Sequence, residues 1–521
     1  MPCGAISGGV EMFESAELEH LVSKADYNKE EPQLRADLLD AQYDVLQAKR
    51  FAVLILVNGL DAAGKGETVN LLNAWMDPRN IDTYAFSDPS DEEQERPHMW
   101  RYWRALPPKG RIGIMFGNWY TEPIQQRVAG EMKGPELDQR MEEITRFEKM
   151  LTDEGVLLLK FWFHLGKADQ KRRLKLLGAD AKTAWRVTDL DWWRWEHYEE
   201  YKRFSEHVLR QTSTGFAPWT VVDGYDARYR SMTVGKILLD AMQRRLARPD
   251  VNHRVSAAPF QRVLEGKNLL SALDLSQALA KKKYESLLAE WQGRLHTLTM
   301  DERFRNRSLI IVFEGNDAAG KGGSIRRITG ALDARQYQIV PIAAPTEEER
   351  DQPYLWRFWR RVPRHGRVAI FDRSWYGRVL VERIEGFCGE ADWMRAYAEI
   401  NDFEDQLTRH GAIVVKFWLS ISKEEQFRRF KEREDTRFKR FKITDEDWRN
   451  REKWDAYEEA VCDMVDRTST EIAPWTLVPA EDKNFARIMV LSTLCQRLES
   501  ALGPKPKSGK TTEKPAKKTK N

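Results

Sequence analysis

The sequence is poor in the residues that form disulfide frameworks and metal clusters. Its 521 residues include only four cysteines, far apart along the chain, and nine histidines without the spacing of a metal-binding pair. A disulfide scaffold and a structural zinc site are therefore not expected. No basic region followed by an apolar run opens the chain, and no apolar string approaches the roughly 20 residues that cross a bilayer. We expect a protein of the reducing cytoplasm that does not use a membrane as a partner.

An excess of charge of one sign is also lacking. The chain has 84 Lys and Arg against 81 Asp and Glu, a net charge of +3. Residues 504–521 hold seven Lys and one Glu and contribute +6, so residues 1–503 carry −3. This balance does not indicate a nucleic acid as partner. The Lys- and Pro-rich tail at 504–521 is predicted to be disordered, and it either keeps the chain in solution or binds a polyanion.

The chain does contain a repeat. The string GLDAAGKG at 59–66 returns as GNDAAGKG at 315–322, with seven of eight residues identical and an offset of 256. The same offset relates WRYWR at 100–104 to WRFWR, KFWFHL at 160–165 to KFWLSI, and APWTVV at 217–222 to APWTLV. A constant offset predicts two tandem copies of one domain. We expect them at residues 1–247 and 267–503, joined by a linker at 248–266.

Each copy is predicted to fold as an α/β domain. Short apolar runs alternate with helical stretches, which is typical of a parallel sheet of about five strands between helices. Helical segments are expected at 15–50 and 269–298, ahead of each first strand. The clearest strands are expected at Phe51–Val57, Arg111–Phe116, Val156–Phe163 and Trp219–Val222, and in the second copy at Leu309–Phe313, Arg367–Phe371, Ile413–Leu419 and Trp475–Val478. A weaker fifth strand precedes Pro89 and Pro345.

A glycine-rich loop with a lysine follows the first strand of each copy. In this context, loop N–H groups and the N-terminus of the next helix point at phosphate oxygens, and Lys321 adds a positive charge. Two such loops at one offset favour a phosphate site over a turn kept for packing. The predicted phosphate-binding residues of the loop are Gly315, Asn316, Ala318, Ala319, Gly320, Gly322 and Gly323.

The loop departs from that of nucleoside triphosphatases. Their lysine is followed by Ser or Thr, whose hydroxyl holds Mg²⁺, but Gly322 stands here. Asp317 lies inside the loop instead. Its carboxylate would repel bound phosphates unless a cation lay between the carboxylate and the phosphates. Asp317 is therefore predicted to be a metal ligand, with a turn cap as the alternative.

The next strand separates the two copies. The second copy ends this strand in FDRSWYGR, with Asp372 placed to hold Mg²⁺ beside the loop. Arg373, Arg378 and Glu382 follow it. The aligned residues of the first copy are Phe116, Gly117, Glu122 and Gln126. The first copy is therefore predicted to be degenerate and inactive.

Two cationic stretches also mark the second copy. Residues 428–442 are rich in Arg and Lys. The first copy has Leu177, Ala181 and Thr183 in place of Arg433, Arg437 and Lys439, and Ala179 in place of Asp435. Twelve Arg and no Lys lie between 326 and 383. Arg suits bidentate recognition of phosphate, so this density indicates a ligand with many phosphates. A solvated helix face is the alternative for residues 428–442.

Three motifs of the second copy together resemble the polyphosphate kinase 2 family. They are GNDAAGKGG at 315–323, FDRSWYGR at 371–378, and the pattern D-x3-K-x-[FW]-K-x-[ST]-x2-D at 435–447. The tandem arrangement is similar to the two-domain branch, which phosphorylates AMP to ADP with inorganic polyphosphate. The resemblance implies a three-layer P-loop kinase-like fold with a helical lid. Two lid positions, Thr436 and Phe441, differ from the usual Pro and Trp.

The resemblance also implies roles for individual residues. Asp317, Lys321, Asp372 and Arg373 correspond to catalytic positions, with Asp317 and Asp372 as ligands of Mg²⁺ or Mn²⁺. Further phosphate-site and lid positions are Arg378, Glu382, Arg433 and Lys439.

The predicted reaction is Mg²⁺-dependent, in-line transfer from polyphosphate to AMP. Its alternatives are ADP or GMP as acceptor, or an ATP-dependent nucleoside monophosphate kinase, against which the missing Ser or Thr and the arginines count. A non-catalytic polyphosphate- or nucleotide-binding module fits only the first copy. We expect that copy to act structurally, as the second half of an internal pseudo-dimer, and a homodimer of the chain is a further possibility.

Overall fold

The computed structural model describes residues 12–248, 269–436, 443 and 445–504, which form two compact units. Of the described residues, 12–248 and Ala344–Arg361 belong to the first unit and the others to the second. Apart from residues 248 and 504, the predicted linker and tail lie outside the described residues. Among the described residues, no helix combines the length and the apolar character needed to cross a membrane.

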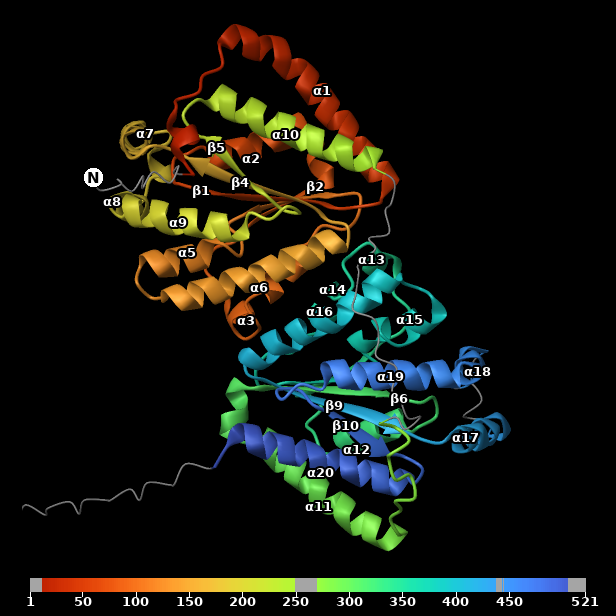
Figure 1. Ribbon diagram of the computed structural model, residues 1–521. Coiled ribbons are helices and arrows are strands. Elements are labelled where there is room, and N and C mark those ends of the chain that lie inside the picture. The colour runs from red at the N-terminus through yellow and green to blue at the C-terminus, as the bar shows by residue number, and fades with distance from the viewer. Residues whose placement is uncertain (1–11, 249–268, 437–442, 444, 505–521) are drawn as a thin grey trace, which may run out of the picture. The chain divides into compact units, whose positions relative to one another are not determined.

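Each unit is built on a sheet of five parallel strands (Figure 1). In the first unit they are β1 (Val53–Gly59), β2 (Ile81–Ala85), β3 (Ile112–Phe116), β4 (Leu157–His164) and β5 (Trp219–Asp223), in the order β2-β3-β1-β4-β5. In the second unit they are β6 (Ser308–Gly315), β7 (Tyr337–Pro341), β8 (Val368–Asp372), β9 (Ala412–Ser420) and β10 (Trp475–Pro479), in the order β7-β8-β6-β9-β10. The two sheets are equivalent at the 256-residue offset, which confirms the predicted tandem α/β fold.

Helices cover both faces of each sheet (Figure 1). One face of the first sheet carries α1 (Lys24–Ala48), α2 (Lys65–Trp75) and α10 (Ala227–Ala247), and the other α5 (Thr121–Val128), α6 (Gly134–Asp153) and α9 (Tyr198–Thr212). In the second unit, one face carries α11 (Lys281–Thr299), α12 (Lys321–Thr329) and α20 (Lys483–Leu502). The other face carries α15 (Val381–Glu385), α16 (Glu390–Arg409) and α19 (Trp454–Thr468). Two further helices of each unit lie beyond the carboxyl ends of the strands. They are α7 (Lys167–Ala179) and α8 (Asp189–Glu196) in the first unit, and α17 (Lys423–Asp435) and α18 (Asp445–Glu452) in the second.

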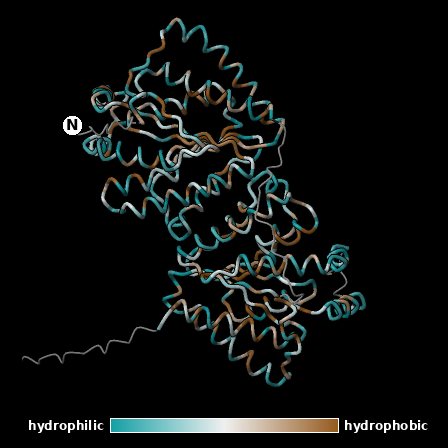
Figure 2. Tube along the Cα trace, in the orientation of Figure 1, coloured by the Kyte–Doolittle hydropathy of each residue, from teal (hydrophilic) through white to brown (hydrophobic). Residues whose placement is uncertain are grey.

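The central strands are largely buried, because both faces of the sheet are covered, and β1 and β9 are buried along their whole length. Figure 2 shows them as the most hydrophobic part of each unit. In β6, Leu309, Ile311 and Phe313 are fully buried in one cluster with residues of α11, α12 and α20. This packing fixes the strand that leads into the glycine-rich loop.

The helices that precede the first strands begin later than predicted. The expected helical starts at 15 and 269 are wrong, because α1 begins at Lys24 and α11 at Lys281. The Ser23 side chain accepts a hydrogen bond from the Asp26 amide and caps α1, which sets its start. Residues Glu14–Glu17 form a separate 3₁₀ turn.

The first unit takes in a segment of the second repeat. Within it, α14 (Trp356–Trp359) lies against α4 (Trp100–Arg104). The rings of Trp103 and Trp359 stack with centroids 5.7 Å apart and planes at 18°. These two residues are equivalent at the 256-residue offset.

Candidate active site

The glycine-rich loop of the second unit leaves open space above its backbone. Gly315 has φ +144°, and a Cβ there would lie 2.4 Å from the Leu419 carbonyl oxygen, so only glycine fits. Gly320 has φ +113° at the start of α12, and a Cβ at Gly320 or Gly322 would meet nothing within 4 Å. The N-terminus of α12 therefore faces a space that a ligand can enter.

Lys321 folds back over this loop. Its Nζ donates to the carbonyl oxygens of Gly315 at 2.7 Å and Asn316 at 3.3 Å. Burial lowers the pKa of Lys321, while the neighbouring Asp317 carboxylate opposes that shift. The Oδ1 atom of Asn316 accepts from the Ile421 amide at 3.1 Å and ties the loop to the end of β9.

Asp317 connects the loop to two other elements. The Arg373 guanidinium contacts its Oδ1 at 3.0 Å, and the Asn450 amide on α18 donates to its Oδ2 at 2.9 Å. Arg373 follows β8 directly and has φ +62°, an unusual conformation for a residue other than glycine. It also approaches Glu446 of α18 at 3.7 Å. Loop, strand end and lid helix thus meet at one carboxylate.

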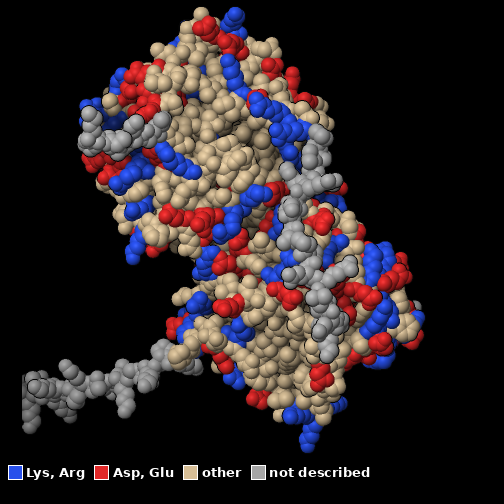
Figure 3. Space-filling model, in the orientation of Figure 1, with Lys and Arg blue, Asp and Glu red and all other residues tan. Residues whose placement is uncertain are grey.

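A cavity of about 510 Å³ opens between these elements. Seven cationic and four anionic side chains line it, so positive charge dominates. Charged residues of both signs gather over α17 and α18 at its edge (Figure 3). The predicted residues that line the cavity are Asp317, Ala318, Ala319, Gly320, Lys321, Gly322, Gly323, Asp372, Arg373 and Arg433.

Four cations of this cavity were not among the predicted site residues. They are Arg326 on α12, Arg429 on α17, and Lys483 and Arg487 on α20. The buried Arg429 donates to the carbonyl oxygens of Ala318 and Ala319 at 3.0 and 3.1 Å, so it also fixes the loop. Comparing the copies could have found three of the four, since the first copy has Asn70, Ala227 and Ser231 at the positions of Arg326, Lys483 and Arg487.

Several predicted residues lie elsewhere. Gly315, Asn316, Arg378 and Glu382 do not line this cavity, and Arg378 pairs with Glu382 at 3.0 Å. Lys439 lies outside the described residues. Only Arg326 and Arg373 of the twelve arginines between 326 and 383 line the cavity. Most arginines of this stretch therefore lie outside the cavity.

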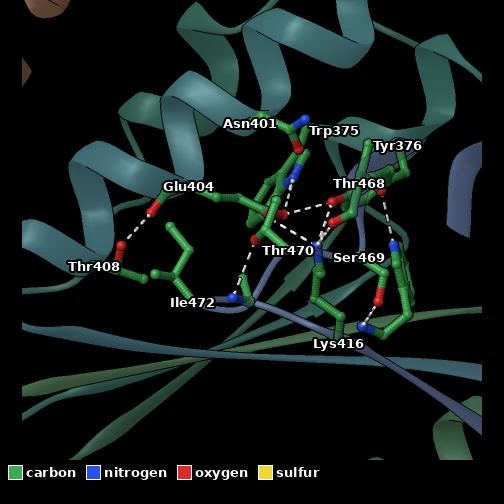
Figure 4. A network of polar contacts seen from close by, with 12 residues as sticks. Trp375, Tyr376, Asn401, Glu404, Thr408, Lys416, Thr468, Ser469, Thr470 and Ile472 are labelled. Carbon is green, nitrogen blue, oxygen red and sulfur yellow. Dashed lines mark hydrogen bonds and ion pairs between the residues drawn. The ribbon is translucent and has the colours of Figure 1, made fainter. Parts of the chain in front are cut away.

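A buried polar network supports the end of β8 (Figure 4). Glu404 of α16 accepts hydrogen bonds from Trp375 Nε1 at 3.1 Å and Tyr376 OH at 2.7 Å. Lys416 of β9 contacts Glu404 at 2.7 Å and Tyr376 OH at 2.7 Å, and it donates to the Thr468 carbonyl oxygen at 2.8 Å. Trp375 and Tyr376 come directly after the Asp372–Ser374 turn. The network therefore holds the backbone that presents Asp372 and Arg373.

The carboxylates of Asp317 and Asp372 line the same cavity. No group of three or more Asp, Glu, His or Cys side chains with metal-site geometry occurs among the described residues. Two carboxylates without further protein ligands suit Mg²⁺, which keeps several waters and shares phosphate oxygens with a substrate. The donor set thus fits such an ion.

The first copy lacks this arrangement. Asp61 is paired within its own unit, to Lys65 at 3.3 Å and to Arg194 of α8 at 3.1 Å. Phe116 stands in place of Asp372. Gly117, in place of Arg373, has φ +69°, and a Cβ there would lie 2.6 Å from the Phe86 carbonyl oxygen. A larger side chain cannot enter this turn without a backbone shift.

The glycine-rich loop of the first copy is also blocked. The buried guanidinium of Arg230 lies so close to Gly64 that a Cβ on Gly64 would be 2.1 Å from its Cζ. Glu67, where the second copy has Gly323, holds this guanidinium at 2.6 Å and that of Arg173 at 2.8 Å. An internal ion pair thus fills the space that is open above Gly320.

Comparison with known proteins follows the same division into two copies. The family model of Polyphosphate kinase 2 matches residues 21–249 and again residues 278–506. The chain belongs to the polyphosphate kinase 2 family. The polyphosphate:AMP phosphotransferase of Pseudomonas aeruginosa is 59% identical over 94% of this chain and 99% of its own length. The protein of the same name from Acinetobacter johnsonii is 38% identical over 90% of this chain and 96% of its own.

A solved structure agrees with this assignment. The crystal structure of a protein assigned to polyphosphate kinase 2 from Pseudomonas aeruginosa superposes with a TM-score of 0.86. It is 57% identical and covers 94% of this chain and 99% of its own. The resemblance of the three motifs to the polyphosphate kinase 2 family is therefore confirmed.

Proposed function

We propose that the chain transfers the terminal phosphoryl group of inorganic polyphosphate to AMP and forms ADP, and that its second unit does so. The observation that carries this proposal is the cavity at the glycine-rich loop, where seven cationic side chains surround a space that is also lined by Asp317 and Asp372. Full-length relatives named polyphosphate:AMP phosphotransferase support the choice of donor and acceptor. In this proposal the protein is a polyphosphate-dependent nucleotide kinase that acts in the cytoplasm.

The donor lies along the cationic side of the cavity. Backbone N–H groups at Gly320 and Gly322 and the ammonium of Lys321 hold its terminal phosphates. Arg326 and Arg487 extend the positive charge away from the loop, along α12 and α20. A chain of phosphates offers nothing but anionic oxygens, which such a row of cations recognises.

The reaction is an in-line displacement. An α-phosphate oxygen of AMP attacks the terminal phosphorus of polyphosphate, and the bond to the bridging oxygen breaks. That oxygen leaves with its electron pair as the new chain end. The attacking oxygen is already anionic, so the step needs no general base. Positioning and charge stabilisation by Lys321 and Arg373 carry the catalysis.

Asp317 and Asp372 would hold Mg²⁺, with Mn²⁺ as an alternative, and the ion would neutralise phosphate charge beside them. Arg373 lies on Asp317 at 3.0 Å, within reach of the same phosphates. Arg433 lines the cavity from α17, so closure of the lid over bound phosphates brings its charge to them. Arg378, Glu382 and Lys439 are retained as further phosphate-site residues on the family resemblance alone.

The first unit has a structural role in this proposal. Phe116 replaces a metal ligand, and Arg230 fills the loop, so it does not take up polyphosphate. We propose that it stands for the second subunit of a dimer. The stacking of the equivalent residues Trp103 and Trp359 within the first unit supports this idea.

Donor and acceptor are tested by incubating the protein with Mg²⁺, AMP and long-chain polyphosphate, then separating AMP, ADP and ATP. Parallel reactions replace polyphosphate by ATP, and AMP by GMP or ADP. We expect ADP from AMP only with polyphosphate. Transfer from ATP alone would establish a nucleoside monophosphate kinase instead. If the protein formed ATP from ADP faster than it formed ADP from AMP, the preferred acceptor would be ADP instead of AMP.

A further inference from the structure

The first unit contains a cavity of about 920 Å³ whose function the proposed reaction does not explain. It lies at the carboxyl ends of β1 and β3 and is bounded by α5 and α8. This volume suits a ligand of small-molecule size. Gly59, Asp61 and Lys65 of the glycine-rich loop line it, but Arg230 and Glu67, which block that loop at Gly64, do not.

The walls of this cavity are more aromatic than the equivalent positions of the second copy. Three positions that are charged in the second copy are apolar here, and a fourth changes from aliphatic to aromatic. Phe116, Trp193, Leu190 and Phe86 take the places of Asp372, Arg449, Glu446 and Ile342. Tyr102 and Tyr201 add two further rings. Such walls stack flat rings.

The cations of the cavity are already paired. Lys65 and Arg194 both contact Asp61, and Arg101 contacts Glu93 at 3.4 Å and donates to the Ser87 carbonyl oxygen at 2.9 Å. Glu122, aligned with Arg378, brings an anion to the wall. A phosphate would therefore meet paired cations and an added carboxylate.

Two residues that line the cavity each carry a buried nitrogen donor without an acceptor. Among the described residues, neither Trp162 Nε1 nor Arg194 Nε has a hydrogen-bond partner. Trp162 is 1% exposed, and an unpaired buried donor costs free energy unless a ligand or water accepts from it. Asp88 and Glu131, at the exposed rim, can accept hydrogen bonds from sugar hydroxyls, as acidic residues do with ribose in dinucleotide-binding folds.

We propose that this cavity binds a neutral nucleoside, with the base among the aromatic side chains and the ribose at the acidic rim. The base supplies the acceptors that the buried donors lack. A nucleotide binds more weakly, because its phosphate has no unpaired cation among the described lining residues and lies near Glu122.

The test is equilibrium dialysis of the full-length protein against radiolabelled adenosine. We expect saturable binding of one adenosine per chain and weaker competition by AMP than by unlabelled adenosine. Trp193→Ala removes a stacking surface worth about 1–3 kcal/mol, so the Kd should rise about 5- to 150-fold. The matched variant of the second copy, Arg449→Ala, should leave the Kd unchanged.

Phe116→Asp provides a second variant, which introduces the aspartate that the second copy has at position 372. It should also weaken adenosine binding, and it tests the proposal if Trp193→Ala does not fold. Calorimetric unfolding of each variant shows whether the fold is kept. The proposal is overturned if adenosine does not bind saturably. It is equally overturned if Arg449→Ala abolishes binding while Trp193→Ala and Phe116→Asp retain it, or if AMP binds the wild-type cavity as tightly as adenosine.

Discussion

Removing the Tyr376 hydroxyl should disturb the end of β8 without touching the cavity itself. In the Tyr376→Phe variant, Glu404 loses one donor at 2.7 Å and Lys416 loses one acceptor at 2.7 Å. Hydrogen bonds to charged groups contribute about 1.5–3 kcal/mol each, and the network is buried. Losing both bonds therefore costs about 3–6 kcal/mol, which lowers the Tm of a unit of this size by roughly 6–24 °C.

The tandem repeat supplies a matched control for this change. Tyr120 of the first unit donates to Glu148 at 2.6 Å and accepts from Lys160 at 3.3 Å. Tyr120→Phe should therefore destabilise its own unit by a similar or slightly smaller amount. Calorimetry of the two variants would show which thermal transition moves in each.

Only the second-unit variant should affect turnover, if catalysis lies there. Tyr376 holds the segment that presents Asp372 and Arg373, and a displacement near 1 Å can cost about a hundredfold in rate. We expect a fall in kcat of about ten- to hundredfold for Tyr376→Phe and none for Tyr120→Phe, measured as ADP formed from polyphosphate and AMP. Equal loss of kcat in both variants would refute the assignment of catalysis to the second unit. Unchanged kcat in Tyr376→Phe would refute the positioning role of the network.

Three further predictions address the two loops. Arg487→Ala should raise the KM for polyphosphate about tenfold, which corresponds to a loss of about 1.4 kcal/mol of binding free energy, and should leave the KM for AMP unchanged. A selective rise in the KM for AMP would contradict this prediction. Burial raises the pKa of the Glu314 carboxyl, so in the folded state this carboxyl stays protonated at a higher pH than in the unfolded state. The folded state therefore loses stability as the pH rises. Glu314→Gln should therefore raise the Tm more at pH 8 than at pH 5, and the opposite order would show that its charge is stabilised. Replacing Arg230 by Ala and Glu67 by Gly should open the first loop and increase polyphosphate binding from one site to two per chain, whereas unchanged stoichiometry would show that the pair is not what blocks it.

The repeat made much of this architecture predictable from the sequence. Two loops at a constant offset implied two equivalent units, and buried parallel strands showed as nearly continuous apolar runs. The contrast of Asp372 with Phe116 pointed to the end of β8, which lines the cavity because the carboxyl ends of neighbouring parallel strands meet at one edge of the sheet. The onset of α1 was less predictable, since a single cap at Ser23 decides it.

The cationic wall was only partly predictable. Lys483 and Arg487 begin the last helix, more than 160 residues after the loop, and only the folded chain brings them beside Lys321. The block in the first loop was hidden for the same reason: Arg230 and Glu67 are far apart in sequence, and neither belongs to a recognisable motif.

The central claim, transfer from polyphosphate to AMP by the second unit alone, is tested most directly by two equivalent lysines. Lys321→Ala and Lys65→Ala are compared with wild type for ADP formed from AMP and long-chain polyphosphate with Mg²⁺. Both lysines contact the carbonyl oxygen of the first loop glycine, at 2.7 and 2.6 Å, so the two substitutions remove the same local contact. We predict that Lys321→Ala loses at least a hundredfold in kcat/KM and that Lys65→Ala keeps the wild-type value. Retained activity in Lys321→Ala, or a comparable loss in Lys65→Ala, would contradict the account.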